Sequence, residues 1–161
     1  MDLLKTLYYP LLLTVVFSFQ VRAQEDPPFV LDVPYVPTPE KVVTAILELA
    51  KVNESDVLYD LGSGDGRIPI AAAKTHGIKA VGIELNPEHV RLAKTNVKNA
   101  GVSDKVEIIE GDIFKTDFIE ATVLTLYLFP EINERLKPKI FNLKSGTRIV
   151  SHKIRYGKLE T

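Results

Sequence analysis

The sequence contains no cysteine, and neither sign of charge dominates it. The absence of cysteine excludes disulfides, thiolate metal sites and cysteine nucleophiles, but it leaves the compartment open. Its 20 lysines and arginines nearly balance 21 aspartates and glutamates, which gives a formal net charge of −1. Because no broad basic field would attract a polyanion, we expect no nucleic-acid partner unless a local patch supplies the charge. No cluster of metal-ligand side chains stands out either, so we expect no metal.

Charged residues are also missing from residues 6–21, which are largely apolar. Lys5 precedes this run, and Val21 and Ala23 occupy the positions that a signal peptidase reads, so residues 1–23 have the outline of a signal peptide. The run is shorter than the roughly 20 residues of a membrane-spanning helix, and Pro10 interrupts it. An uncleaved hydrophobic anchor and a buried or interfacial helix are the alternatives. We expect an exported or membrane-associated protein, with the side of the membrane left open.

Five prolines lie between residues 24 and 39, too many for a helix or a central strand. We therefore expect a Pro-rich linker at 24–39, of which residues 34–39 are apolar enough to pack on the domain. Residues 40–161 are long enough for one domain.

Short apolar segments alternate with amphipathic ones through this domain. Strands are expected at residues 57–61, 79–85, 106–110, 122–129 and 148–151, and helices from residue 40 to about 50 and at 67–75, 87–99 and 131–143, with Pro138 breaking or kinking the last helix. This alternation predicts an α/β fold with a central, mostly parallel sheet and helices on both faces.

A glycine-rich loop, Asp60-Leu-Gly-Ser-Gly-Asp-Gly66, joins the first of these strands to the helix that follows. In an open α/β sheet this turn lies at the carboxyl edge, where ligands bind. The glycine spacing is G-x-G-x-G rather than the G-x-G-x-x-G of dinucleotide-binding loops. A carboxylate at Asp60 would repel a pyrophosphate but suits the α-ammonium group of an amino-acid-like ligand. The loop therefore favours S-adenosylmethionine (SAM) over a dinucleotide.

Two further carboxylates follow the next two strands. Glu84 ends the second strand, where it can accept hydrogen bonds from both hydroxyls of a ribose. Asp112, after the third strand, can reach an adenine amino group. Each feature also has a plain structural explanation: glycine turns occur without ligands, Glu84 could be a surface charge, and Asp112 could cap a short helix. Their order along the chain is what favours SAM.

Residues 60–68 (DLGSGDGRI), residues 80–87 (AVGIELNP) and the preceding Pro-Tyr-Val-Pro-Thr resemble one branch of the class I SAM-dependent methyltransferases. That branch contains the lysine methyltransferases of the ATP synthase c-subunit and of the adenine nucleotide translocase, with bacterial relatives. The resemblance covers about residues 34–152 and implies a Rossmann-like fold and methyl transfer from SAM to a protein lysine.

The resemblance also implies roles for particular residues. The methionine part of SAM would lie against the loop and the ribose against Glu84. The adenine would lie against Leu85 and against Asp112 and Ile113, which follow the third strand. Tyr127 would face the substrate, although a buried core tyrosine is an equal alternative. The implied cofactor residues are Asp60, Gly62, Ser63, Gly64, Asp65, Gly66, Glu84, Leu85, Asp112 and Ile113; the implied substrate or lid residues are Tyr35, Pro37, Thr38, Phe129 and Pro130.

No residue identifies itself as the catalytic base. An amine acceptor must lose a proton, since the reference pKa of lysine is about 10.4. His76 and His89 lie on or just after predicted helices and are expected to be solvated. His152, just past the fifth strand, is the histidine candidate beside Tyr127.

Two features depart from the family pattern. Class I methyltransferases normally end with an antiparallel pair of strands, and residues 152–161 leave no room for one, so we expect the C-terminal strands to be truncated. A cleaved export signal would also separate the enzyme from SAM, which is made in the cytosol. The alternatives to a protein-lysine methyltransferase are a small-molecule methyltransferase, a non-catalytic SAM-binding remnant and, least favoured, a nucleotide-dependent oxidoreductase.

Overall fold

The computed structural model describes residues 36–152. The expected signal peptide or anchor at 1–23, most of the Pro-rich linker, Tyr35 and residues 153–161 lie outside the described residues. Within the described part, no helix is both long and apolar enough to cross a membrane.

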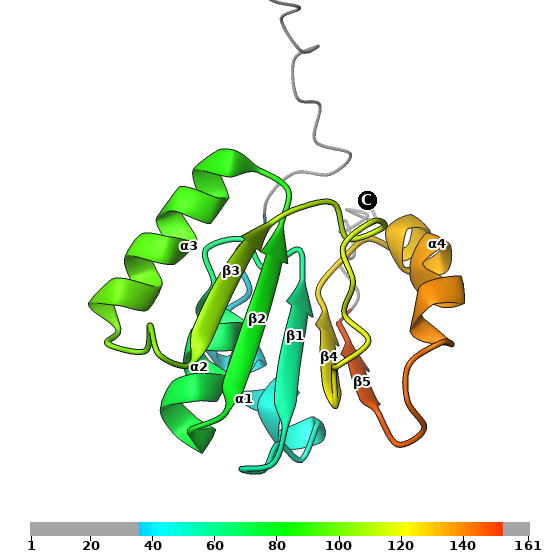
Figure 1. Ribbon diagram of the computed structural model, residues 1–161, viewed down its shortest axis with the longest axis horizontal. Coiled ribbons are helices and arrows are strands. Elements are labelled where there is room, and N and C mark those ends of the chain that lie inside the picture. Colours follow the sequence, from blue (N-terminus) through cyan, green and yellow to red (C-terminus); the bar gives the residue numbers. More distant parts are fainter. Residues whose placement is uncertain (1–35, 153–161) are drawn as a thin grey trace, which may run out of the picture.

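Five parallel strands form a single sheet in the order β3-β2-β1-β4-β5 (Figure 1). They are β1 (Val57–Leu61), β2 (Lys79–Glu84), β3 (Val106–Glu110), β4 (Val123–Leu126) and β5 (Arg148–Ser151). The predicted parallel sheet is confirmed, although β4 ends at Leu126 rather than at Phe129. The chain starts in the middle of the sheet, runs outward to β3 and then crosses to β4. This change of direction opens a crevice at the carboxyl ends of β1 and β4.

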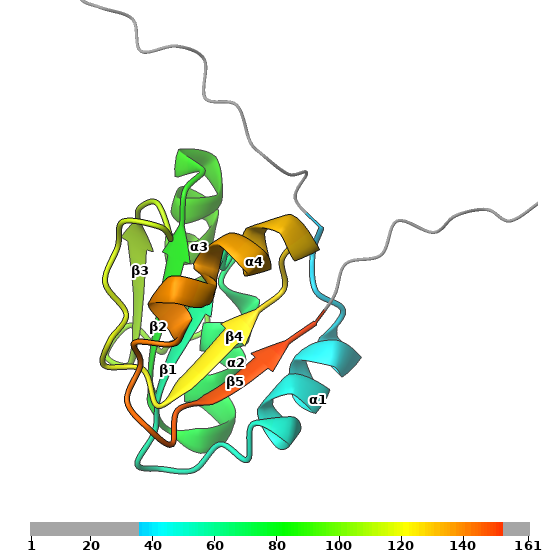
Figure 2. The same ribbon diagram turned by 90° about the vertical axis from the view of Figure 1, so that its right-hand side faces the viewer.

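Helices cover both faces of the sheet, as the alternation predicted (Figure 2). The helices are α1 (Glu40–Leu49), α2 (Arg67–His76), α3 (Pro87–Asn99) and α4 (Pro130–Ile140). The first three share one apolar core with one face of the sheet, and α4 packs in a second core on the other face. Of the two effects expected of Pro138, a break is wrong, because α4 continues through the proline to Ile140.

Side chains alternate between these two cores along each strand. Leu58, Ala80 and Val123 belong to the core under α1–α3, whereas Leu61 and Ile83 belong to the core under α4. Alternation continues to the carboxyl ends of the strands, where the side facing α1–α3 changes from apolar to polar. The polar residues there are Asp60, Glu84 and Thr125, all buried. The fold thus gathers buried polar groups at the crevice.

Arg148 links the C-terminal end of α1 to the end of the sheet opposite the crevice. Its guanidinium donates to the carbonyls of Ala50 and Lys51, just after α1, at 2.9 and 2.7 Å, and forms an ion pair with Asp56. The Thr122 hydroxyl donates to the same Asp56 carboxylate at 2.7 Å. The C-terminal end of α1 is therefore fixed to β1, β4 and β5 on the side of the sheet away from the crevice.

Candidate functional site

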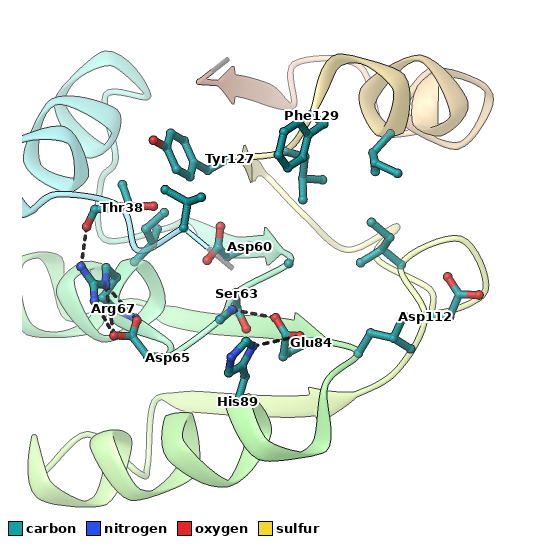
Figure 3. Close-up of a pocket in the computed structure, with 18 of the residues that line it drawn as sticks. Thr38, Asp60, Ser63, Asp65, Arg67, Glu84, His89, Asp112, Tyr127 and Phe129 are labelled. Atoms are coloured by element: carbon teal, nitrogen blue, oxygen red, sulfur yellow. Dashed lines mark hydrogen bonds and ion pairs between the residues drawn. The ribbon is translucent and has the colours of Figure 1, made fainter. Parts of the chain in front are cut away.

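A cavity occupies the crevice at the carboxyl ends of the strands (Figure 3). Its walls come from the segment before α1, the glycine loop, the ends of β2, β3 and β4, and the first turns of α3 and α4. The lining residues are Val36, Thr38, Asp60, Gly62, Ser63, Gly64, Asp65, Arg67, Ile68, Glu84, Leu85, His89, Asp112, Ile113, Phe114, Tyr127, Leu128, Phe129, Ile132 and Arg135.

The glycine loop needs its glycines for conformation and for space. Gly62 and Gly66 have φ angles of 75° and 79°, in the left-handed region that side chains with a Cβ disfavour. A Cβ on Gly62 would also lie 2.8 Å from Cδ2 of Leu128. Gly66 is the N-cap of α2, so the loop passes directly into a helix whose N-terminus adjoins the cavity.

Ser63 packs closely against Gly82 of the neighbouring strand β2. A Cβ on Gly82 would lie 2.6 Å from Oγ of Ser63, so only glycine at position 82 lets the serine side chain enter. The Ser63 backbone N–H donates to the carbonyl of Ile83 at 3.0 Å. Its buried Oγ has no hydrogen-bond partner among the described residues. A buried hydroxyl that lines a cavity and lacks a partner fits a polar ligand.

Asp60 lies at the floor of the cavity, at the end of β1. Its Oδ1 accepts a hydrogen bond of 2.6 Å from the hydroxyl of Thr125 on the neighbouring strand. The pKa of Asp60 is raised to about 7, chiefly by burial and also by the charges of Glu84 and Asp65, against the lowering effect of the Thr125 hydrogen bond. A cationic ligand group beside this carboxylate would stabilise its ionised form. The α-ammonium of SAM has the required charge.

Glu84 is buried, so it is not a surface charge. Oε2 accepts from the N–H of Gly64 at 2.8 Å, and Oε1 accepts from the N–H of Asn86 at 2.8 Å. These two bonds fix the carboxylate while each oxygen keeps a second lone pair, which suits a pair of ribose hydroxyls. His89 Nδ1 lies 3.8 Å from Oε1. The expectation that His89 is solvated is wrong, because α3 turns this half-buried side chain toward β2 and the cavity.

The turn after β3, which contains Asp112, Ile113 and Phe114, forms the other end of the cavity. Asp112 both lines the cavity and caps its own turn, since its Oδ1 accepts from the N–H of Phe114 at 2.8 Å. The Arg135 guanidinium carbon lies 4.1 Å from the centre of the Phe114 ring. Lys139 holds α4 against this turn by donating to the carbonyls of Ile113 and Thr116 at 3.2 and 2.6 Å. Leu85, which is 43% exposed, and Ile113 both line the cavity, and apolar side chains of this kind suit a flat base.

The two catalytic candidates lie together at the carboxyl ends of β4 and β5. The ring centres of Tyr127 and His152 are 4.8 Å apart and their planes are tilted by 48°. Tyr127 is half-buried and lines the cavity, so it is not a residue of either core, while His152 is exposed. The N–H of His152 donates to the carbonyl of Leu126 at 2.8 Å, which places the histidine at the rim.

A segment before α1 closes the cavity from the side. We call residues 36–39 the lid segment; Val36 and the buried Thr38 line the cavity. Arg67 donates from Nη1 to the carbonyl of Thr38 at 2.6 Å, and its Nε and Nη2 lie 2.9 and 2.5 Å from the Asp65 carboxylate (Figure 3).

The structure brings together most of the residues that the sequence singled out. All the implied cofactor residues except Gly66 line the cavity, and so do Thr38 and Phe129 of the lid and substrate set. Pro37 is exposed and Pro130 opens α4; neither lines the cavity. Val36 and Leu128 also line the cavity, within the two stretches expected as lid and as substrate-facing segment. The sequence patterns missed the following lining residues: Arg67, Ile68, His89, Phe114, Ile132 and Arg135. The helical spacing of apolar residues predicts that Ile132 is buried, as it is in α4. No local sequence pattern singles out Arg67 or His89.

Known proteins resemble this chain in sequence and in fold. The family described as "ANTKMT methyltransferase domain" matches residues 60–160. A "Protein-lysine N-methyltransferase" of Saccharolobus islandicus is 53% identical over 126 residues, which cover 77% of this chain and 78% of that protein. The ATP synthase c-subunit lysine N-methyltransferase of Mus musculus is 34% identical over 73% of this chain and 47% of that protein. The chain thus spans about half of the mouse relative.

Two similar solved structures identify the cofactor. A crystal structure from Salinibacter ruber, described as an RNA methyltransferase in complex with S-adenosylhomocysteine (SAH), has a TM-score of 0.73 and 56% identity, covering 77% of this chain and 82% of that one. A SAM-dependent methyltransferase from Geobacter sulfurreducens, also with SAH, has a TM-score of 0.62 and 27% identity over 71% and 47% of the two chains.

The residues of the cavity fit the group that these structures bind, and they do not fit a dinucleotide. The carboxylate of Asp60 would oppose a pyrophosphate, while Glu84 and the unpartnered Ser63 hydroxyl offer sites for polar groups of a nucleoside and an amino acid. The chain belongs to the family of the ANTKMT methyltransferase domain and is a SAM-dependent methyltransferase with a Rossmann-like fold.

Proposed function

We propose that this enzyme methylates the ε-amino group of a protein lysine. The observation that carries the proposal is the 53% identity to the Saccharolobus protein-lysine N-methyltransferase along most of both chains. The mouse relatives, named for lysines of the ATP synthase c-subunit and of the adenine nucleotide translocase, point to the same acceptor chemistry.

The charge of the cavity supports a cationic acceptor. Four carboxylates line it (Asp60, Asp65, Glu84 and Asp112) against two arginines. One arginine, Arg67, is held by Asp65 and Thr38, and the other, Arg135, lies over Phe114. Because the cofactor is expected to contact Asp60, Glu84 and Asp112, these charges act on the acceptor at longer range: they favour the approach of a lysine side chain and oppose that of RNA phosphates.

RNA is the second candidate, because the Salinibacter protein carries that description at 56% identity. The formal net charge of −1 weighs against it, since most RNA-binding surfaces collect lysine and arginine to neutralise phosphates. The choice between the two acceptors is therefore an outcome of the experiment below.

The enzyme has two tasks in the reaction: to align the acceptor and to receive its proton. SAM supplies a methyl group on a sulfonium, so the amine lone pair forms the N–C bond as the S–C bond breaks, and one proton is released. The face of the Tyr127 ring positions the amine at the cavity mouth. His152, with its ring centre 4.8 Å from that of Tyr127 and open to solvent, accepts the proton and passes it to water.

The direct test supplies methyl-labelled SAM with three separate acceptor pools: RNA-free protein extract, total RNA and small metabolites. Label recovered as methyllysine after acid hydrolysis of the protein supports the proposal. Label confined to RNA or to small molecules contradicts it and identifies the other class of methyltransferase. SAH binding without turnover on any pool indicates a non-catalytic remnant.

The roles of the two rim residues are tested by Tyr127→Phe and His152→Gln. Tyr127→Phe keeps the ring and should retain most of the activity, whereas Tyr127→Leu should lose at least about tenfold. His152→Gln should lower kcat about 100-fold near neutral pH and recover as pH approaches the pKa of the acceptor amine. A pH-independent loss in His152→Gln would show that this histidine is not the base.

The location of the enzyme is a separate proposal. The uncharged run at residues 6–21 supports delivery of the chain to a membrane or across it. Fractionation of cells combined with N-terminal sequencing tests this. A membrane-bound chain that starts at Met1 identifies an anchor, and a chain that starts at Gln24 identifies a cleaved signal. An uncleaved chain in the soluble fraction contradicts both.

A further inference from the structure

The Arg67 side chain links three parts of the cofactor site that are distant in sequence. Its Nη1 donates to the Thr38 carbonyl of the lid segment at 2.6 Å, and its Nε and Nη2 hold Asp65 of the glycine loop. Asp65 is in turn fastened to α3, because Nδ2 of Asn96 donates to the Asp65 carbonyl at 3.0 Å. The guanidinium thus joins the lid segment to the glycine loop (Figure 3), and the Asp65 carbonyl joins the loop to α3.

The lid segment is stiff where Arg67 holds it. Thr38 lies between Pro37 and Pro39, so its backbone is confined to extended conformations. Helix α1 begins immediately afterward, since the N–H groups of Val42 and Val43 both donate to the Pro39 carbonyl. A displacement of the Thr38 carbonyl therefore moves Val36 and the start of α1 together rather than being absorbed locally.

The same pair of side chains separates the cofactor cavity from a second depression. Asp65 and Arg67 line both the cavity and an open groove between α1, α2 and α3, whose other residues include Glu40, Lys74 and Asn96. The ion pair is therefore a wall between the bound cofactor and solvent on the helix side. A shorter side chain at position 67 would open a path for water at this point.

We propose that Arg67 is a positioning residue that couples occupancy of the glycine loop to closure of the lid segment over the cofactor. When a ligand orders the loop, Asp65 holds the guanidinium in the orientation that keeps the Thr38 carbonyl in place. When the loop is empty and mobile, the lid segment loosens with it and the cofactor or its product exchanges. This inference requires SAM binding but does not depend on which molecule accepts the methyl group.

The test is hydrogen exchange of the full chain, with and without SAH, in the wild type and in Arg67→Lys. Lysine keeps the charge but cannot hold Asp65 through two nitrogens and Thr38 through a third. In the wild type, SAH should slow exchange of the Val36 and Thr38 amides as well as those of the glycine loop. In Arg67→Lys, SAH should still protect the loop but no longer the lid segment, and the Kd for SAH should rise about tenfold.

Arg148→Lys is the matched control, because Arg148 fastens the opposite end of α1 and lies far from the cavity. It should lower stability while leaving SAH affinity and lid protection as in the wild type. Equal lid protection by SAH in Arg67→Lys and wild type would overturn the proposal, and so would equal loss of lid protection in Arg148→Lys. If Arg67→Lys does not fold, Asp65→Asn provides the same uncoupling readout, since it weakens the hold on the guanidinium but leaves Arg67 intact.

Discussion

Asp60 is the residue whose ionisation gives the most quantitative prediction. Its pKa is raised to about 7: burial is the largest cause, the charges of Glu84 and Asp65 add to it, and the Thr125 hydroxyl works against it. In the unfolded chain the same carboxyl has a pKa near the reference value of about 3.9. The folded, unliganded protein therefore keeps a proton on Asp60 that the unfolded chain releases between about pH 4 and pH 7.

The direction of the effect on stability follows from this difference. A carboxyl with a raised pKa in the folded state contributes stability that is fully present below the unfolded pKa and is lost as pH rises through the folded pKa. The difference of roughly three between the folded and unfolded pKa values corresponds to about 4 kcal/mol of unfolding free energy. The amide of Asp60→Asn does not titrate. The free energy of unfolding of this variant, relative to that of the wild type, should therefore rise by about 4 kcal/mol as the pH is raised from about 4 to about 8.

Urea unfolding of both proteins without ligand, at the two ends of this pH range, measures that gain. A stability difference between variant and wild type that is the same at both pH values would refute the reasoning. Ligand binding provides a second readout, because the ammonium of SAH favours ionised Asp60. Wild-type affinity for SAH should fall as pH drops below about 7, by up to about tenfold for each pH unit, with proton release seen by calorimetry in two buffers.

Three other substitutions test separate contacts. Gly82→Ala places a Cβ 2.6 Å from Oγ of Ser63 and should lower the free energy of unfolding by about 1–3 kcal/mol, with part of the loss recovered by Ser63→Gly in the same chain; urea unfolding measures both, and no loss would refute the clash. Thr125→Val removes the hydrogen bond to Asp60 and should raise the pH midpoint of SAH binding by about one unit, whereas an unchanged midpoint would remove Thr125 from the site. Lys139→Met keeps the aliphatic stem but loses two donors to the turn after β3, and should lower the free energy of unfolding by about 1–2 kcal/mol in the same assay, with equal stability contradicting that role.

The sequence predicted the sheet and the floor of the site because both follow from local patterns. A few adjacent residues suffice to predict each apolar strand, the glycine loop, and the helix boundaries at Pro87 and Gly101. The position of Asp60 and Glu84 at one sheet edge then follows from the parallel arrangement alone. Even the change from apolar to polar side chains at the ends of β1 and β2 is visible in the sequence once the alternation is known.

The walls of the site depend on contacts that no local pattern specifies. Arg67 reaches Thr38 across 29 residues of sequence, and the contact exists only because the lid segment crosses the start of α2. His89 faces Glu84 because of the rotation of α3 about its axis, which tertiary packing sets. Gly82 is the exception, because a glycine inside a buried strand indicates that another group approaches closely, and that group is Ser63.

Calorimetric titration of SAH into the full chain, beside Asp60→Ala and Glu84→Ala, tests the central claim most directly. The claim is that these two carboxylates, at the ends of β1 and β2, hold the amino-acid and ribose parts of the cofactor. We expect micromolar binding by the wild type and none by either variant, with circular dichroism confirming that all three proteins are folded. Unchanged affinity in both folded variants would contradict the claim and place the cofactor elsewhere.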